Sequence, residues 1–415
     1  MDKTPKTKEK RLYTRHSLLE GWDQDIIKNS TVFMIGVGAL GCEIAKNLAL
    51  VGIGNMILVD NDTIETSNLS RQMLFKPGDE GKPKAEVAAR ELKKFNPYMN
   101  IETYFTFLQE IPLEVYKKCD LIIGGLDNIK ARMDLNKICI RLKKPLIDSG
   151  TLGFEGHVHI VIPEGIEGLE STPCLKCLLP IPPADEKLIA ACTPKGIPKK
   201  REHCVLKAEY EFGNRFSRTP DFDNDDDIIW LVNKSNEIAK KFDFKPDFKF
   251  DDMENILKNK MPAIQTVTAV IAAIQSHEIL KILHKLKGKD IGPIMSPPYL
   301  NYNGVYGIFE LIDIAKDPNC LHCGSGKFET IEVTINKNEH IDTLFGLVSS
   351  AIGECDPDSC LITVELTKKT IWNPFVERLR DPNKTLNELN IQNGEILVFA
   401  CAGKDPLNIL ISYDE

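Results

Sequence analysis

The sequence lacks the apolar segments by which membrane and exported proteins are recognised. Its longest apolar run, Val267–Ile274, is far shorter than the ~20 residues that a membrane-spanning helix needs. The first residues are polar and carry no apolar core of the kind found in signal peptides. We therefore expect no membrane partner and a cytoplasmic location.

An excess of positive charge is also missing. The 52 Lys and Arg residues are outnumbered by 60 Asp and Glu residues, which leaves a net charge of −8. A nucleic-acid partner is therefore not expected, because binding to phosphates depends mostly on basic side chains. At 415 residues the chain is too long for one typical core, so two or three folded units are predicted.

The first part of the chain alternates between strand and helix patterns. Apolar runs at Thr31–Ile35, Met56–Val59, Leu121–Ile123 and Pro145–Ile147 predict buried strands, with helical segments between them. Such alternation predicts a parallel sheet with helices on both of its faces. The fold class is therefore α/β.

The alternation ends near residue 170. Residues 171–201 carry several prolines and predict a long crossover, and residues 209–216 and 228–241 have helical patterns. The acidic run 221–227 is interpreted as a solvated loop rather than a docking patch. Residues 263–286 predict a helix that is apolar on most faces at its start, which indicates burial in a core.

Residues 328–415 have a different pattern, with a strand, a helix and further strands in that order. We predict a separate small α+β domain there. Its strands are expected near residues 328–335, 361–366, 395–400 and 407–412.

A phosphate-binding loop is predicted directly after the first strand. Gly36, Gly38 and Gly41 form a G-x-G-x-x-G motif at the head of a helix, where glycines let the backbone approach phosphate closely. Asp60 ends the next strand, where an acid can hold ribose hydroxyls. These residues alone would also suit an NAD-dependent dehydrogenase.

The residues that follow Asp60 favour ATP over NAD. Hydride transfer needs no cluster of cations and carboxylates, whereas charge developing on a triphosphate does. Arg71 and Lys84 supply the cations, and Asp127, after another strand, supplies a carboxylate suited to Mg²⁺. The other residues counted as nucleotide ligands in this segment are Asp62, Asn68 and Gln72.

The run GVGALGCE…DNDTIETSNLSRQ…GKPKAE…GLDN resembles the adenylation domain of the ubiquitin-activating enzyme family and of its bacterial relatives in sulfur transfer. The resemblance implies a Rossmann-like adenylation domain in which the three glycines cradle ATP and Asp60 holds the ribose. Arg71 and Lys84 would contact phosphates, and Asp127 would organise magnesium. Ser70 stands where eukaryotic members usually carry Asn, which puts only its own role as a ligand in doubt.

Two Cys-x-x-Cys pairs predict a metal site. Cys174, Cys177, Cys320 and Cys323 can form a closed tetrahedral shell around Zn²⁺, which is typical of a structural site. A redox role for one pair is the alternative. The family resemblance implies zinc as well, but relatives in sulfur transfer also hold zinc in this way.

Of the 12 cysteines, Cys192 stands outside any core pattern, in a proline-bearing stretch with several nearby cations. The stretch CTPKGIPKKREHC resembles the catalytic-cysteine signature of the SUMO-type activating subunit and its eukaryotic sister. That match makes Cys192 the thioester-forming residue and Thr193 a candidate helper, with His203 and Cys204 structural. The remaining cysteines are expected to be free: Cys42, Cys119, Cys139 and Cys401 in cores, and Cys355 and Cys360 without chemistry.

The stretch around Arg15 resembles a family element whose arginine reaches the ATP site of a partner subunit. It predicts a homodimer in which Arg15 acts in trans, as in prokaryotic-style members. An ordinary surface arginine, and a heterodimer with an inactive adenylation subunit, are the alternatives.

The resemblance implies four segments: adenylation domain (1–190 and 261–327), an inserted helical catalytic-cysteine region (191–260) and a C-terminal ubiquitin-like β-grasp domain (328–415). It implies that a ubiquitin-like protein is adenylated with ATP, Mg²⁺ and a Zn²⁺-stabilised fold. The modifier would then pass through a thioester on Cys192 to a conjugating enzyme recruited by residues 328–415. An adenylyltransferase for a ubiquitin-like sulfur carrier and a non-catalytic subunit are the alternatives.

Overall fold

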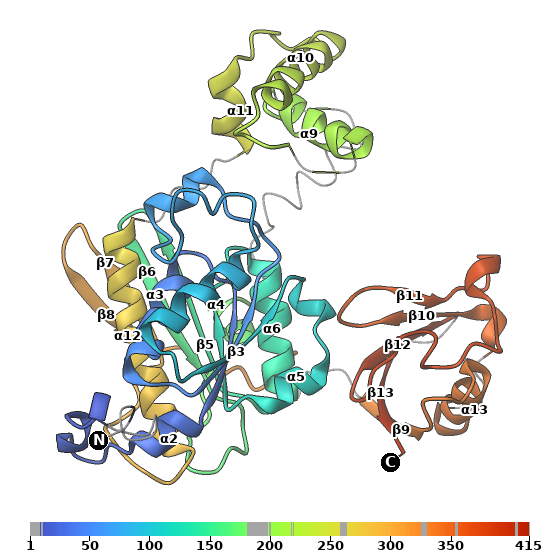
Figure 1. Ribbon diagram of the computed structural model, residues 1–415. Coiled ribbons are helices and arrows are strands. Elements are labelled where there is room, and N and C mark those ends of the chain that lie inside the picture. The colour runs from blue at the N-terminus through green and yellow to red at the C-terminus, as the bar shows by residue number, and fades with distance from the viewer. Residues whose placement is uncertain are drawn as a thin grey trace.

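The structure is a computed structural model. It describes residues 9, 11–180, 198, 201–216, 218, 220–257, 264–324, 330–352, 356–402 and 406–414. Within these residues the chain forms one large sheet flanked by helices, a helical lobe and a second, smaller sheet with its own helix (Figure 1).

The large sheet has eight strands in the order β3-β2-β1-β4-β5-β6-β7-β8. Their bounds are β1 Thr31–Ile35, β2 Asn55–Val59, β3 Asn100–Tyr104, β4 Leu121–Gly124, β5 Leu146–Leu152, β6 Glu155–Val161, β7 Tyr299–Asn303 and β8 Ile308–Ile312. The five strands β3-β2-β1-β4-β5 are parallel, in the order of a doubly wound nucleotide-binding fold. The predicted α/β class is confirmed.

The strands predicted up to residue 147 are parallel as expected, but the sheet continues beyond β5 with three strands that were not predicted. There β6, β7 and β8 pair antiparallel, each with the strand before it. Only two residues, Gly153 and Phe154, connect β5 to β6, and a connection this short allows only an antiparallel neighbour.

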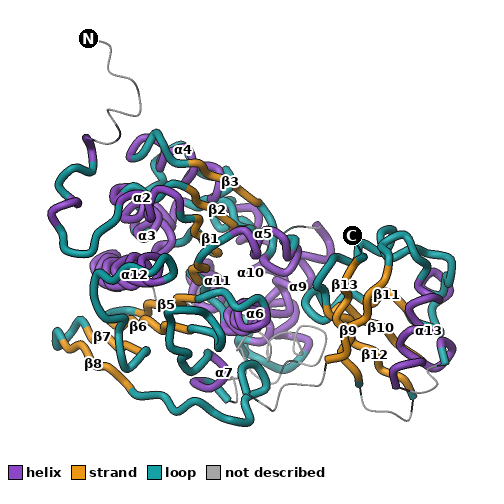
Figure 2. Tube along the Cα trace, turned by 90° about the horizontal axis from the view of Figure 1, so that it is seen from below, coloured by secondary structure: helices purple, strands orange, loops and turns teal. Residues whose placement is uncertain are grey.

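Helices cover both faces of the large sheet (Figure 2). One face packs against α2 (Gln24–Asn29), α3 (Ala39–Val51), α4 (Lys84–Phe95) and α12 (Gln265–Lys285). The other packs against α5 (Leu113–Lys118), α6 (Ile129–Arg141) and the short α7 (Leu175–Leu178). Alternate residues of the buried strands therefore enter two different cores.

Helix α12 is the one helix in the described ranges that is long and apolar enough to cross a bilayer by length and composition. Most of its apolar window is buried, because it packs along α3 and across β5 and β6. It is a core helix, as its all-round apolarity predicts.

A helical lobe is formed by α9 (His203–Phe216), α10 (Asp225–Lys241) and α11 (Phe250–Leu257), and it lies beyond the sheet in Figure 1. It has a core of its own that includes Phe212 and Leu231. The acidic run is not only a solvated loop, because Asp225–Asp227 form the first turn of α10, where acidic side chains favour the helix dipole. Asp227 is buried and accepts both guanidinium hydrogen bonds of Arg218.

The second sheet has the order β11-β10-β12-β13-β9, in which β9 and β13 are parallel. Its elements are β9 Thr330–Ile335, α13 Ile341–Ile352, β10 Cys360–Val364, β11 Thr370–Trp372, β12 Ile396–Cys401 and β13 Leu407–Tyr413. These residues bury a third apolar core, separate from those of the large sheet. Its identity as a ubiquitin fold stays a prediction.

Short 3₁₀ helices complete the described elements: η1 His16–Leu18, η2 Thr66–Ser70, η3 Leu108–Glu110, η4 Pro357–Ser359 and η5 Glu377–Leu379.

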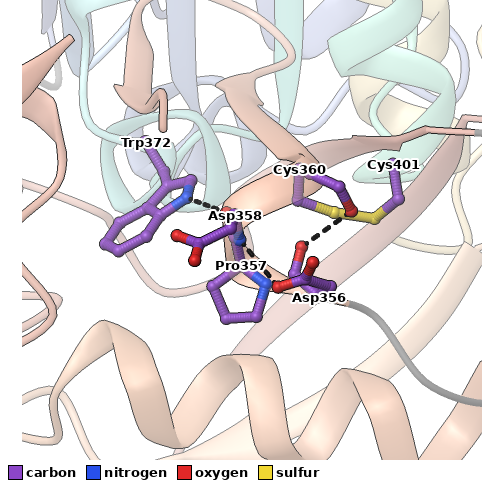
Figure 3. Close-up of a disulfide and its surroundings, with 7 residues drawn as sticks. Asp356, Pro357, Asp358, Cys360, Trp372 and Cys401 are labelled. Atoms are coloured by element: carbon purple, nitrogen blue, oxygen red, sulfur yellow. Dashed lines mark hydrogen bonds between the residues drawn. A yellow bond between two sulfur atoms is a disulfide. The ribbon is translucent and has the colours of Figure 1, made fainter. Parts of the chain in front are cut away.

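The second sheet contains a disulfide between Cys360 and Cys401 (Figure 3). The expectation that these two cysteines are free is wrong. They stand directly opposite each other in the antiparallel pair of β10 and β12, and the chain separates them by 41 residues. Figure 3 shows the segment Asp356–Asp358 between the disulfide and Trp372, whose indole Nε1 donates to the Pro357 carbonyl at 2.9 Å.

The second sheet contacts the domain of the large sheet mainly through charged residues of α6. Lys137 and Arg141 pair with the buried carboxylate of Glu365, which follows β10. The backbone N–H of Leu113 donates to Gln392 Oε1 at 3.3 Å. Burial lowers the pKa of Arg141, while the charge of Glu365 opposes that shift.

Helix α4 carries a carboxylate that holds three cations. Glu91 is buried and accepts from Lys76 at 2.8 Å, from Lys94 at 2.6 Å and from Arg90 at 3.1 Å. These hydrogen bonds, that of Lys76 first, lower the pKa of Glu91 to about 2. Because the pKa in the folded state lies below its ordinary value, the contribution of Glu91 to stability is complete above pH ~4.5 and is lost as the pH falls toward ~2.

We expect Glu91→Gln to lower the melting temperature at pH 6 by about 2–4 °C, the shift that ~1 kcal/mol causes in a domain of this size. The variant should also lose less stability than the wild type between pH 5 and pH 3. Scanning calorimetry across this range measures both effects, with Glu86→Gln, an exposed position on the same helix, as the control. Equal acid sensitivity in all three proteins would contradict the prediction.

Candidate nucleotide and metal sites

The predicted phosphate loop lies where β1 and β4 end side by side. Gly36 has φ +93°, and a Cβ there would stand 2.5 Å from the carbonyl oxygen of Gly125, which follows β4. A Cβ on Gly41 would stand 2.2 Å from the Gly36 carbonyl oxygen. Neither position tolerates a side chain, so the loop stays flat against both strand ends.

Gly38 differs from these two glycines because nothing lies within 4 Å of the position its Cβ would take. It is the N-cap of the 13-residue helix α3, so the unpaired N–H groups of the first helical turn open onto this space. An anion is favoured at such a place by the helix dipole and by direct hydrogen bonds. The loop therefore fits the phosphates of a nucleotide.

Asp60 ties the phosphate loop to the segment that follows β2. Its Oδ2 accepts the N–H of Val37 at 2.6 Å, and its Oδ1 accepts the N–H of Asp62 at 2.8 Å. Burial raises the pKa of Asp60, and the charge of Lys84 opposes this rise. The structure adds a loop-holding role that sequence reasoning missed. The ribose contact stays a prediction, and a carboxylate has acceptor sites for it beyond those that these two bonds use.

Lys84 is the first residue of α4 and is buried, although its ammonium reaches the exposed carboxylate of Asp62 at 2.8 Å. The charge of Lys84 acts to lower the pKa of both Asp60 and Cys42, which places the ammonium beside the phosphate loop. A buried cation paired with one exposed acid can exchange that partner for a phosphate. The fit to a triphosphate is therefore electrostatic as well as geometric.

The other predicted ligands of this segment surround η2. Asn68 caps this turn by accepting the N–H of Glu65 at 3.1 Å, and Arg71 donates to the Ser67 carbonyl at 2.9 Å. Arg71 forms no ion pair within the described ranges, so its charge is available to a ligand. Gln72 is buried and its Oε1 has no hydrogen-bond partner there, which is unusual unless a ligand or water supplies one.

Asp127 lies in the loop between β4 and α6, at the same edge of the sheet as the glycine loop. Gly125 donates its N–H to the Ile35 carbonyl at 2.8 Å, which fixes the start of this loop to the end of β1. Asn128 ends it as the N-cap of α6, with its Oδ1 accepting the N–H of Ala131 at 2.8 Å. The carboxylate of Asp127 is exposed between these two anchors and could hold Mg²⁺ together with phosphate oxygens.

The four cysteines of the two Cys-x-x-Cys pairs come together, although the chain separates the pairs widely. All four sulfurs lie within 4.8 Å of one another. The Sγ–Sγ distances are 3.9 Å for Cys174–Cys177, 3.6 Å for Cys174–Cys320 and 3.5 Å for Cys177–Cys323. A Zn²⁺ ion with Zn–S bonds of ~2.3 Å needs sulfurs ~3.8 Å apart, so the cluster fits a closed zinc site.

The four thiols influence one another. The hydrogen bond with Cys323 lowers the pKa of Cys174, whereas burial raises that of Cys177 and the hydrogen bond with Cys174 raises that of Cys323. Asn136, which sequence reasoning missed, joins the two pairs: it accepts the N–H of Leu175 at 3.0 Å and bonds His322 Nδ1 at 2.7 Å. No local signal marks Asn136, because its partners lie far along the chain.

Two predicted catalytic residues, Cys192 and Thr193, lie outside the described residues. Arg15 is exposed on the N-terminal arm and does not lie among the residues of the phosphate loop. The described residues that begin this arm are anchored to the large domain. Tyr13 is buried, and Trp22 donates to Gln24 Oε1 at 3.0 Å.

Comparison with known proteins agrees with this geometry. The model of the ThiF family matches residues 13–322. The chain is 32% identical to the NEDD8-activating enzyme E1 catalytic subunit of Arabidopsis thaliana, over 78% of this chain and 72% of that protein. It is 35% identical to SUMO-activating enzyme subunit 2 of Dictyostelium discoideum, over 57% of this chain and 34% of that protein.

The fold also resembles that of MccB of E. coli crystallised with ATP, at 22% identity and a TM-score of 0.46, with 72% of this chain and 68% of that chain covered. A likeness this low supports no functional argument. The family match and the curated relatives are sufficient: the chain belongs to the ThiF family, among the ubiquitin-like modifier activating enzymes.

We expect the purified protein to contain about one zinc ion per chain, as a closed shell of four cysteines requires. Cys320→Ser should lose the ion and melt at a lower temperature, because the two Cys-x-x-Cys pairs are then no longer joined. Metal analysis by mass spectrometry and calorimetry measure these effects. Cys119→Ser, a buried cysteine outside the cluster, is the control and should keep the ion. A wild type purified with iron, or without metal even when Zn²⁺ is supplied, would contradict the prediction.

Proposed function

We propose that this protein activates a ubiquitin-like modifier by adenylating its C-terminal carboxyl group with ATP and then binding it as a thioester on Cys192. The observation that carries the proposal is the shared sheet edge at which an open helix N-cap, a buried lysine and an exposed aspartate meet. Gly38, Lys84 and Asp127 offer there a phosphate cradle, a cation and a magnesium ligand. The relatives named as NEDD8-activating subunits suggest a NEDD8-like modifier.

In the first step, a carboxylate oxygen of the modifier attacks the α-phosphorus of ATP. The bond from that phosphorus to the leaving oxygen breaks, and pyrophosphate departs with the electron pair. Lys84 and Arg71 would stabilise the negative charge that develops in this step. Bound Mg²⁺, held by Asp127, would neutralise further phosphate charge.

In the second step, a cysteine thiolate attacks the acyl carbon of the adenylate, and AMP leaves with the bonding electrons. The burial of several described cysteines makes them unsuitable as this nucleophile. Burial raises the pKa of Cys42 and of Cys119 to about 12 and also raises that of Cys139, so these thiols are poor nucleophiles. Cys204 is buried in the helical lobe, and burial raises its pKa too.

The remaining described cysteines are not available as the nucleophile either. Four form the metal cluster and two form the disulfide. Cys192 and Cys355, which lie outside the described residues, are the two candidates left. Cys192 is the better one, because Lys195, Lys199 and Lys200 can favour its thiolate.

We expect Cys192→Ala to abolish the thiol-sensitive covalent adduct that forms with ATP and a NEDD8-like protein. ATP–pyrophosphate exchange should continue in this variant, because adenylation precedes the thioester. Gel electrophoresis with and without reducing agent, together with radiolabelled exchange, separates the two steps. Cys355→Ala is the matched control and should keep the adduct.

Loss of the adduct in Cys355→Ala but not in Cys192→Ala would reverse the assignment. Adenylation with no adduct in the wild type, for any modifier offered, would instead favour the adenylyltransferase for a sulfur carrier.

We further propose that the domain of residues 330–414 recruits the conjugating enzyme that receives the modifier. Its independent core supports a separate binding module, and its charged contact with α6 attaches it to the adenylation domain. The acceptor cysteine of the conjugating enzyme would attack the thioester carbonyl, which returns the thiolate of Cys192.

Arg15 supports a dimer in which each subunit completes the site of the other. The arm that carries it is held by Tyr13 and Trp22, yet Arg15 itself is exposed and forms no ion pair within the described ranges. The arm borders a cavity of about 820 Å³, to whose lining α3 and α12 contribute both apolar side chains, such as Leu50 and Leu280, and polar ones, such as Asn47. Leu19 and Leu50 are exposed at this cavity, so a partner subunit would cover apolar surface there.

We expect Arg15→Ala and Lys84→Ala each to reduce ATP–pyrophosphate exchange by about 100-fold, the usual cost of removing one group that stabilises transition-state charge. Dimers that pair one variant subunit with the other should recover one working site, because Arg15 and Lys84 then come from different chains. Co-expression with two affinity tags isolates these mixed dimers. Failure of the mixed dimer to recover would show that Arg15 does not act across a homodimer.

A further inference from the structure

Arg132, in the first turn of α6, forms a set of contacts that the proposed chemistry does not yet use. Its side chain runs from the helix back to the sheet and is only 15% exposed. Its Nε donates to the carbonyl of Leu126 at 2.9 Å, in the loop that carries Asp127. Its Nη2 donates to the carbonyl of Ser149 in β5, also at 2.9 Å. One guanidinium therefore joins the loop after β4 to the neighbouring strand.

The third nitrogen of the guanidinium faces a buried carboxylate. Nη1 lies 3.4 Å from Asp148 Oδ2 and 3.1 Å from His157 Nε2. Asp148 is 1% exposed and stands opposite Gly124, the last residue of β4. Burial alone raises the pKa of Asp148, but the positive charge of Arg132 and the proximity of His157 outweigh it, so the carboxyl ionises more readily than usual.

The backbone around the guanidinium is shaped to admit it. A Cβ on Gly150 would stand 2.5 Å from Arg132 Nη2, so any larger residue there would displace the side chain. A Cβ on Gly124 would stand 3.1 Å from Asp148 Oδ1, which is tighter than most contacts. Two glycines thus leave room for one ion pair.

Stability alone does not explain this arrangement. A buried ion pair of this kind gains little over well-packed apolar side chains, because both charges lose their hydration. The oxygen Asp148 Oδ1 has no hydrogen-bond partner within the described ranges, which adds to the cost. The pair instead fixes the orientation of the groups that bond it, because a planar guanidinium donates hydrogen bonds in fixed directions.

We propose that Arg132 is a positioning residue, which holds the backbone at Leu126 so that the carboxylate of Asp127 points to the place of the nucleotide phosphates and their metal. The loop is then fixed on both sides of Asp127, by Arg132 before it and by the Asn128 cap after it. Asp148 supplies the charge that keeps the guanidinium in place. This inference rests on the proposed use of Mg²⁺ and ATP, and it adds a residue that touches neither.

The test compares ATP binding with excess Mg²⁺ and with EDTA, by isothermal titration calorimetry on the full chain. In Arg132→Lys one ammonium replaces the planar fork and cannot hold both carbonyls in the same directions. We expect the ratio of the two affinities to fall about tenfold, the usual effect of removing a group that orients a metal ligand. Binding in EDTA and the melting temperature should stay near those of the wild type.

Two further variants separate positioning from a general structural role. Lys130→Ala, an exposed position in the same turn, should leave the ratio unchanged. Arg132→Lys combined with Asp127→Ala should be no worse than Asp127→Ala alone, because both changes remove the same contribution.

The inference is overturned if Arg132→Lys keeps the wild-type ratio of ATP affinities, or if it weakens ATP binding equally with and without Mg²⁺. It is also overturned if the effects of Arg132→Lys and Asp127→Ala on this ratio multiply in the double variant. Arg132→Ala serves as a second variant. Where it folds, the ratio of the two ATP affinities should fall further than in Arg132→Lys. A wild-type protein that binds no ATP would instead refute the proposed function, a result distinct from any of these.

Discussion

The close backbone contact between Gly36 and Gly125 is the constraint on which the candidate nucleotide site depends. This site lies at the edge of the large sheet where β1 and β4 end. These residues follow β1 and β4, neighbouring parallel strands from which the chain leaves in opposite directions across the sheet. In doubly wound folds a ligand binds at such a switch point, outside the carboxyl ends of the strands. Because neither residue carries a side chain, both loops lie close and leave the space above them open.

Charged groups around this opening are buried on one side and accessible on the other. Lys84 is buried, yet its ammonium reaches an exposed acid, and Asp60 uses two acceptor positions for backbone N–H groups. Such partly dry surroundings strengthen electrostatic interactions, since fewer waters screen them. A site built in this way favours a polyanion that replaces weak partners without rearrangement of the backbone.

The other units of the chain are attached to this centre and have cores of their own, although Leu366 of the second unit packs against a core of the large sheet. The helical lobe and the second sheet each bury their own apolar residues. Polar contacts connect them to the large domain, such as the hydrogen bond of Thr66 to Asp223 at 3.0 Å and the pair of Lys137 with Glu365. Units joined in this way can change position at low cost compared with units that share a hydrophobic core.

Much of the candidate nucleotide site could be predicted because the residues that indicate it lie close to one another in the sequence. Gly36, Gly38 and Gly41 follow an apolar strand within a few residues, and Asp60 follows the next one, so spacing alone places them at one edge. The Cys-x-x-Cys pairs are also local, although only the chemistry of zinc suggested that the two pairs meet. The helical residues 228–241 and the buried helix at 263–286 follow from apolar periodicity in the same way.

The class of fold, and the position of the candidate nucleotide residues at one edge of the sheet, could therefore be inferred from the amino-acid order, because short-range pattern and residue type suffice for both. Which distant groups meet was visible only in the folded chain: Cys360 with Cys401 across two strands, Asn136 with His322, and Arg132 with Asp148. The reversal of the strands after β5 was visible only there as well. These features depend on strand register and on the packing of helices against the sheet, and register is set by contacts between segments that no local pattern contains.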